Sequence, residues 1–112
     1  MDLHNISRWS LFALALLSVL AQPLSARAQD PNRLIQTTCI ACHNQYTLQA
    51  GLNLQAFDAE QPHLNPIVAE KIIRKLRSGQ MPPREMARDL DAINHLVTTL
   101  ETRLDRAAAE AK

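Results

Sequence analysis

The chain has 112 residues and a nearly balanced charge, with 12 Lys and Arg against 11 Asp and Glu. A net charge of +1 gives no field that points to nucleic-acid binding. The length allows one small domain, close to the size at which an apolar core alone is only marginally stable. Because only 4% of the residues are aromatic, a bulky flat cofactor would help to fill the interior.

The first 28 residues are predicted to be a cleaved secretory signal peptide. An apolar run, LFALALLSVLA, follows a weakly charged start and is shorter than the roughly 20 residues of a membrane-spanning helix. Ala26, Arg27 and Ala28 then form the small-x-small pattern of a signal-peptidase site, so we expect cleavage before Gln29. An uncleaved interfacial anchor or a buried helix is the alternative. Cleavage would leave one domain, residues 29–112, soluble in the periplasm and without a membrane span.

The remaining chain is predicted to be helical, because no stretch alternates with the period of a strand. Asp30 as an N-cap and Pro31 at the first helical position indicate a short helix that leads into Cys39. Residues 44–65 follow no period and contain glycine and prolines. We therefore expect a loop there, with one helical turn around LQAFDAE.

Two amphipathic helices are predicted in the second half of the chain. Residues 66–79 start with a proline and end at a glycine C-cap. Their apolar face consists of Val68, Ile72, Ile73 and Leu76. A last helix is expected from the N-cap Asp89 nearly to the end of the chain. Its apolar stripe consists of Leu90, Ile93, Val97, Leu100 and Leu104. The linker QMPPREMAR between the two helices contains adjacent prolines and is not expected to be helical.

Both cysteines lie in the short stretch CIACH, in which His43 directly follows Cys42. A disulfide between Cys39 and Cys42 would enclose only two residues and would gain little chain entropy. A thioredoxin-like redox pair belongs to a βαβ fold, and no strands are predicted. A structural zinc site needs a fourth ligand, normally from a second pair of cysteines, which the chain lacks.

The remaining interpretation of CIACH is covalent haem attachment, for which C-x-x-C-H is the known pattern. Two thiols one helical turn apart, those of Cys39 and Cys42, add to the two vinyl groups of a porphyrin. The next residue, His43, then places an imidazole under the iron. The sequence therefore predicts one covalent haem c with His43 as an iron ligand.

Several side chains are candidates for the other axial position of the iron. A thioether sulfur is common in electron-transfer cytochromes because it raises the reduction potential. Met81 is favoured, because it follows a helix-ending glycine and precedes two stiffening prolines. Met86 is the competitor, or either methionine could simply pack against the porphyrin. His63, in a flexible loop, would give bis-histidine ligation, whereas His95 is expected in solvent.

Taken together, the stretches CIACHN, GLNL, EKIIRKLRSGQMPP and RLDRAAAE resemble a class I cytochrome c. More narrowly, they resemble the haem-binding module of planctomycete-type cytochrome c proteins, over most of residues 35–109. The resemblance implies an all-α fold in which three to four helices pack around one covalently bound haem. It implies thioether attachment at Cys39 and Cys42, with His43 as the proximal ligand and Met81 as the distal ligand.

The chain departs from this family pattern in two respects. Many class I cytochromes have a proline whose carbonyl accepts the proximal imidazole hydrogen, and here Leu52 stands in the corresponding stretch AGLNLQ. The narrower group usually continues into further domains, whereas this sequence ends at Lys112. The partner of the domain is therefore not identified by the resemblance.

The favoured function is that of an electron carrier rather than an enzyme. The alternatives are a haem peroxidase or small-ligand sensor, or a truncated module that delivers electrons within a larger secreted enzyme. The partners would be redox proteins. Basic residues gather around the proposed distal ligand, so an acidic partner surface could dock near Lys75 and Arg84. The cluster consists of Lys71, Arg74, Lys75, Arg77, Arg84 and Arg88. The plainer interpretation is the solvated face of an amphipathic helix.

Overall fold

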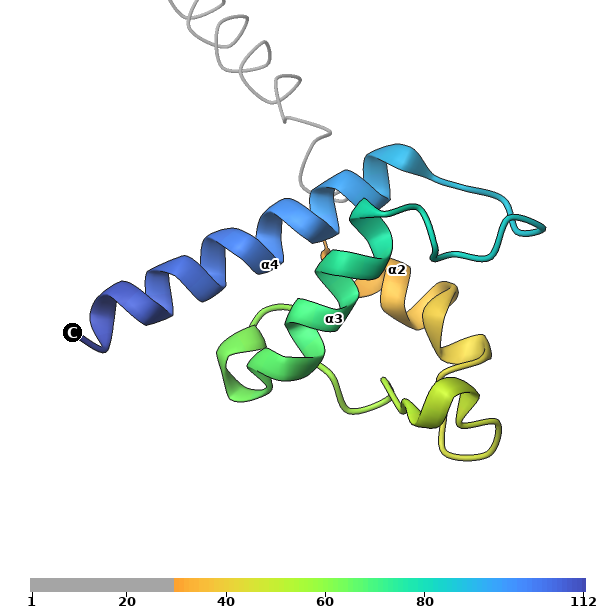
Figure 1. The fold of residues 1–112 in the computed structure, drawn as a ribbon, viewed down its shortest axis with the longest axis horizontal. Coiled ribbons are helices and arrows are strands. Elements are labelled where there is room, and N and C mark those ends of the chain that lie inside the picture. The colour runs from red at the N-terminus through yellow and green to blue at the C-terminus, as the bar shows by residue number, and fades with distance from the viewer. Residues whose placement is uncertain (1–29) are drawn as a thin grey trace, which may run out of the picture.

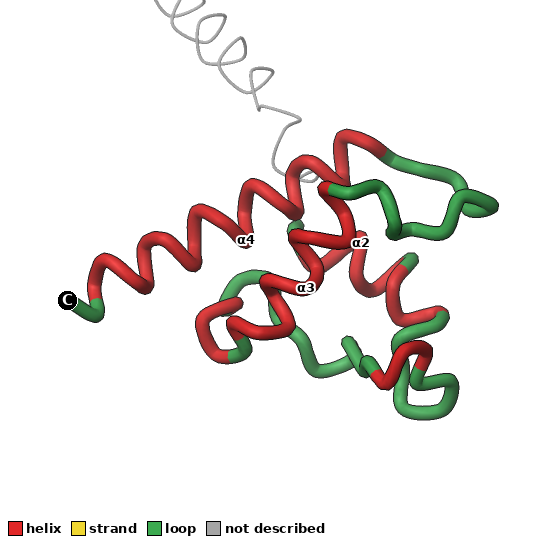
Figure 2. The backbone as a smooth tube through the Cα atoms, viewed as in Figure 1, coloured by secondary structure: helices red, strands yellow, loops and turns green. Residues whose placement is uncertain are grey.

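The computed structural model describes residues 30–112, in which three α-helices are joined by loops and 3-10 turns (Figure 1). The elements are α2 (Asn32–Thr37), η2 (Cys39–Ala41), η3 (Gln49–Gly51), η4 (Pro62–Leu64), α3 (Pro66–Arg77) and α4 (Leu90–Glu110). Figure 2 shows only helices and loops over the described residues, which confirms the all-α prediction. The predicted signal peptide, residues 1–28, lies outside the described residues. Within residues 30–112, no helix is both long and apolar enough to cross a membrane.

Helix α2 begins at Asn32, one residue later than predicted, and Pro31 takes the N-cap position. The first turn is still bonded to Asp30. Its carboxylate accepts a hydrogen bond from the N–H of Asn32 at 2.9 Å, and its carbonyl accepts one from the N–H of Arg33 at 3.1 Å. Pro31 between them already has helical backbone angles, φ −66° and ψ −22°. These bonds satisfy N–H groups that have no partner inside a helix.

Helix α3 buries the face formed by Ala69, Ile72, Ile73 and Leu76. Their spacing is i, i+3, i+4 and i+7, which places four side chains on one stripe of an α-helix. The prediction had Val68 in place of Ala69, and Val68 is only half-buried. Ala69 lies at the start of this stripe. Its side chain is small and only weakly apolar, so the apolar pattern of the sequence did not mark it as buried.

Helix α4 starts at the predicted cap, because the side chain of Asp89 accepts a hydrogen bond from the N–H of Ala92 at 2.9 Å. The buried residues of α4 are Ile93, Leu96, Val97 and Leu100. Leu96 was missing from the predicted stripe, although it is completely buried. Leu90 was wrongly included in that stripe, because the first turn extends beyond the core and leaves this side chain 63% exposed. The last turns of α4 also extend past the other helices (Figure 1).

The expected helical turn around LQAFDAE is wrong, and single 3-10 turns occur instead at η3 and η4. The side chain of Asn32 explains this difference. Its amide nitrogen donates to a carboxylate oxygen of Asp58 at 2.8 Å, and its amide oxygen accepts from the N–H of Ala59 at 2.7 Å. These two bonds hold residues 58 and 59 against α2 in a non-helical conformation.

The core is aliphatic and contains no polar side chain among the described residues. It consists of Leu34, Ile35, Leu54, Ala59, Ala69, Ile72, Ile73, Leu76, Ile93, Leu96, Val97 and Leu100. Of the aromatic residues in the described region, Phe57 packs at its edge and Tyr46 is 86% exposed. Interior volume is thus filled by medium-sized side chains from α2, α3 and α4.

Candidate functional site

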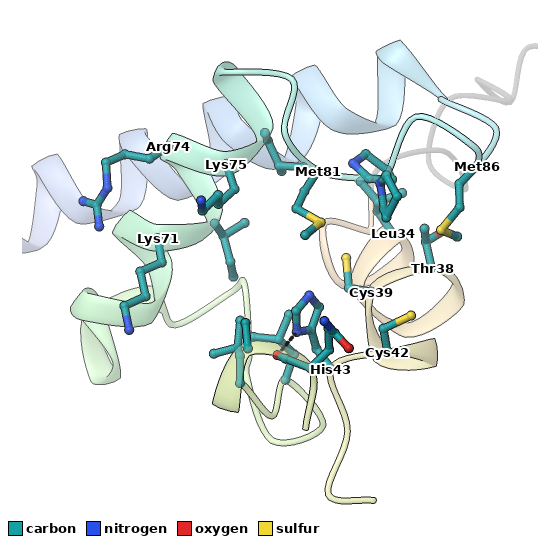
Figure 3. A pocket seen from close by; sticks show the side chains of 18 of the residues that line it. Leu34, Thr38, Cys39, Cys42, His43, Lys71, Arg74, Lys75, Met81 and Met86 are labelled. Atoms are coloured by element: carbon teal, nitrogen blue, oxygen red, sulfur yellow. Dashed lines mark hydrogen bonds between the residues drawn. The ribbon is translucent and has the colours of Figure 1, made fainter. Parts of the chain in front are cut away.

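A cavity of about 580 Å³ opens between two walls of the fold (Figure 3). One wall consists of the end of α2, η2 and the loop around η3, and the other consists of α3 and the linker to α4. The volume lies within the range of roughly 300–1,000 Å³ that is typical of ligand pockets. The lining surface is mostly apolar, and its residues include Cys39, Cys42, His43, Met81 and Met86.

The two thiols reach the cavity because a tight turn follows α2. In η2 the N–H groups of Cys42 and His43 both donate to the carbonyl of Cys39, at 3.3 and 3.0 Å. Both thiols are free and line the cavity. Burial raises the pKa of the Cys39 thiol to about 11, against the smaller opposing effect of a backbone hydrogen bond.

The raised pKa disfavours the Cys39 thiolate, the form that binds a metal or attacks a disulfide. Within residues 30–112, no group of three His, Cys, Asp or Glu side chains is arranged to hold a metal ion. The same residues contain no strand that could support a thioredoxin-like site.

The imidazole of His43 is oriented by the carbonyl of Gln49, whereas the sequence left open whether Leu52 takes over the role of the family's proline. Nδ1 of His43 lies 3.0 Å from the carbonyl oxygen of Gln49, which can only accept, so Nδ1 carries the hydrogen. Figure 3 shows the other ring nitrogen facing the cavity. A ring nitrogen left free in this way is the usual arrangement of a histidine that binds a metal.

The carbonyl of Gln49 reaches His43 because the neighbouring backbone is left-handed. Leu48 has φ 44° and Ala50 has φ 55°, values that L-residues seldom adopt, and Gly51 has φ 69°. Two hydrogen bonds fix this loop to the CIACH segment, from the N–H of Gln49 to the carbonyl of Cys42 at 3.2 Å and from the N–H of Leu54 to the carbonyl of His43 at 2.8 Å. No local sequence signal marks a left-handed leucine or alanine, so this contact was not predicted.

Met81 lies on the opposite wall of the cavity, just after the end of α3. Gly79 is left-handed, with φ 69°, and its N–H donates to the carbonyl of Leu76 at 3.1 Å. The N–H groups of Gln80 and Met81 both donate to the carbonyl of Lys75, each at 3.1 Å. These bonds form a Schellman-type helix end, which confirms the glycine C-cap. Figure 3 shows the thioether of Met81 pointing across the cavity toward the ring of His43.

The competing candidates for an axial position differ in where they lie. Met86 also lines the cavity, but it is 36% exposed, and Figure 3 draws it on the Thr38 side of the cavity rather than facing His43. His63 is exposed on η4 and does not line the cavity. His95 does not line it either, and it is half-buried rather than fully in solvent as expected.

The residues of the basic cluster differ in their contacts and in their distance from the cavity. Arg77 makes two hydrogen bonds to the carboxylate of Glu101, at 2.7 and 2.6 Å. Arg88 is half-buried and bonds to backbone carbonyls of the linker. Three exposed residues lie along the rim of the cavity: Lys71, Arg74, which is 3.9 Å from Glu70, and Lys75, which donates to the side chain of Gln80 at 2.6 Å. Arg84 is exposed but lies outside the lining.

Comparison with known proteins gives one family match. Residues 39–85 match the family model described as Planctomycete cytochrome C. No curated protein and no solved structure matches the chain. The match confirms the resemblance seen in the sequence and supports a c-type cytochrome. It starts at Cys39 and includes His43 and Met81, but it ends before Met86.

Proposed function

We propose that the protein is an exported mono-haem c-type cytochrome that acts as an electron carrier. Cys39 and Cys42 would form the thioether links, and His43 and Met81 would be the axial ligands. The observation that carries this proposal is that one apolar cavity is lined by both thiols, an imidazole and a thioether from chain segments about 40 residues apart. The haem would supply one-electron chemistry at its iron when bound.

The residues of the cavity fit this group in their donor atoms as well as in their positions. His43 presents a ring nitrogen whose partner nitrogen is held by Gln49, and Met81 presents a soft sulfur on the opposite wall. The apolar lining would exclude water from the iron. Solvent access and the axial ligands together set the reduction potential. Cys39 and Cys42 lie between these two side chains and the end of α2 (Figure 3).

A peroxidase or small-ligand sensor is the second class of function. It needs an open or displaceable axial position, and peroxide cleavage also needs a polar acid-base pair near it. The described lining contains no acidic residue and no histidine other than His43. Its polar members are Thr38, Gln49 and the three cations at the rim. This lining supports a carrier more than a peroxidase.

The partner of such a carrier would be a redox protein with an acidic surface. Lys71, Arg74 and Lys75 lie together on one face of α3 at the mouth of the cavity (Figure 3). Glu70 partly offsets this charge, with a carboxylate oxygen 3.9 Å from Arg74. Positive charge beside the place of electron transfer would speed encounter with an acidic partner in a salt-dependent way. Export to the periplasm rests on the predicted signal peptide.

The proposal is tested by spectra of the purified protein and of two matched methionine variants. Wild type should carry haem that resists extraction by acid acetone, and its ferric near-infrared spectrum should contain the thioether-to-iron band. Met81→Ala should remove this band, lower the potential and let carbon monoxide bind the ferrous form rapidly, whereas Met86→Ala should do none of these. Cys39→Ala combined with Cys42→Ala should abolish covalent haem. Wild type without covalent haem, or an exchange of the two methionine phenotypes, would overturn the assignment.

A further inference from the structure

Arg88 lies beyond the family match, yet it contacts the segment that carries Met81. Its Nη2 donates to the carbonyl of Gly79 at 2.7 Å and also to the carbonyl of Pro82. These carbonyls lie two residues before and one residue after Met81. One guanidinium nitrogen therefore bonds to both ends of the short segment 79–82.

The backbone groups of this segment form hydrogen bonds with two parts of the protein, the end of α3 and the side chain of Arg88. The N–H groups of Gly79, Gln80 and Met81 are satisfied by carbonyls at the end of α3. Pro82 has no N–H, and the carbonyls of Gly79 and Pro82 are satisfied by Arg88. Unpaired carbonyls in a half-buried segment would cost free energy. Because the prolines that follow have no backbone N–H, they cannot donate to these carbonyls, and the guanidinium of Arg88 does so instead.

The position of Arg88 is itself fixed by α4. The next residue, Asp89, caps that helix through its side chain, which accepts from Ala92 at 2.9 Å, and its carbonyl accepts from the N–H of Ile93 at 2.9 Å. Ile93 belongs to the core. The linker segment is thus tied at one end to α3 and, through Arg88, to the start of α4.

We propose that Arg88 is a positioning residue that keeps the thioether of Met81 directed into the cavity. The inference rests on the proposed function, because it gives Arg88 a role in axial ligation. It deepens that function by linking the distal ligand to α4. A charged donor suits this role, because a hydrogen bond to a charged group is stronger than one between neutral groups.

The test compares Arg88→Met with Arg84→Met in the haem-loaded protein. Both variants remove one positive charge from the same linker, but Arg84 is exposed and forms no hydrogen bond or ion pair with the described residues. We expect Arg88→Met to speed binding of carbon monoxide to the ferrous protein by about tenfold or more, as the loss of bonds to a charged donor implies. Its thioether-to-iron band should weaken, and its potential should fall. Arg84→Met should stay near wild type in all three measurements.

A second measurement does not depend on the haem ligands. Amide hydrogen exchange at Gln80 and Met81 should become faster in Arg88→Met and remain unchanged in Arg84→Met, because only the former frees the segment. Unchanged exchange in Arg88→Met would overturn the inference, as would faster exchange with an unaltered band and carbon monoxide rate. Wild type without a thioether band would instead overturn the proposed function. If Arg88→Met fails to fold, Arg88→Lys is tested in its place. Its thioether-to-iron band should be weaker than the bands of wild type and Arg84→Met, but it should not be lost completely.

Discussion

Replacing Gly79 by alanine should destabilise the protein through the backbone alone. Gly79 is left-handed, with φ 69°, at the end of α3. No heavy atom lies within 4 Å of the place where a Cβ would be built, so alanine would meet no steric clash. The expected loss therefore reports the conformational cost at this one residue, which makes its magnitude predictable.

The net cost follows from two opposing terms. An L-residue pays about 1–2 kcal/mol in the left-handed region. Alanine recovers about 0.4–1 kcal/mol by reducing the freedom of the unfolded chain. The free energy of unfolding should therefore fall by about 1 kcal/mol, which for a domain of this size corresponds to a drop in Tm of about 4–8 °C.

Urea and thermal unfolding followed by circular dichroism, at equal haem content, would measure this change. Gly79→Asn should lose less than Gly79→Ala, because asparagine tolerates the left-handed region better. Ala50→Gly is the reverse experiment, since Ala50 has φ 55°, and it should not destabilise the protein. Stability of Gly79→Ala equal to that of wild type, or a loss in Gly79→Asn as large as in Gly79→Ala, would refute the reasoning.

Three further predictions concern the core, acid stability and docking. Leu96→Ala should lower the free energy of unfolding, measured in urea, by about 2–5 kcal/mol, because Leu96 is completely buried. Leu104→Ala should lower it less, because Leu104 is only half-buried. The hydrogen bond from Asn32, followed by that from the backbone of Glu60, lowers the pKa of Asp58. The stabilising effect of this carboxylate should be present above its unfolded pKa and vanish as pH falls through the folded pKa. Asp58→Asn should therefore flatten the fall of the urea midpoint on the acid side of the unfolded pKa. Lys71→Glu combined with Lys75→Glu should slow electron transfer with an acidic redox protein and flatten its salt dependence more than Arg84→Glu does; equal effects would show that the rim is not the docking site.

The sequence predicted the helix boundaries well because their signals are local. Asp89 caps α4 through a residue three positions later, and Gly79 ends α3 through carbonyls within five positions. Each signal acts between residues close in sequence, so it can be recognised before the fold is known. The C-x-x-C-H stretch and Met81 were proposed as site residues for the same reason, as short patterns with known chemistry, and they line one cavity.

Contacts between distant segments were not predictable in this way. The carbonyl of Gln49 reaches His43 only because two non-glycine residues, Leu48 and Ala50, are left-handed. Asn32 holds the loop at Asp58, where the sequence suggested a helical turn. Arg88 looked like one more surface charge until the fold placed it against the linker carbonyls. In each case a tertiary hydrogen bond decided the outcome.

The two walls of the cavity have a thermodynamic consequence for the assembled protein. If His43 and Met81 bind one iron, as proposed, that pair of bonds acts as a cross-link between points about 40 residues apart in the chain. By the loop-closure relation used for disulfides, a cross-link of this span lowers the entropy of the unfolded chain by an amount worth about 4 kcal/mol. By the same relation, a disulfide between Cys39 and Cys42 would gain only about half as much, because the loop it closes is short. The long closure is the kind of stabilisation that a domain with a small aliphatic core requires.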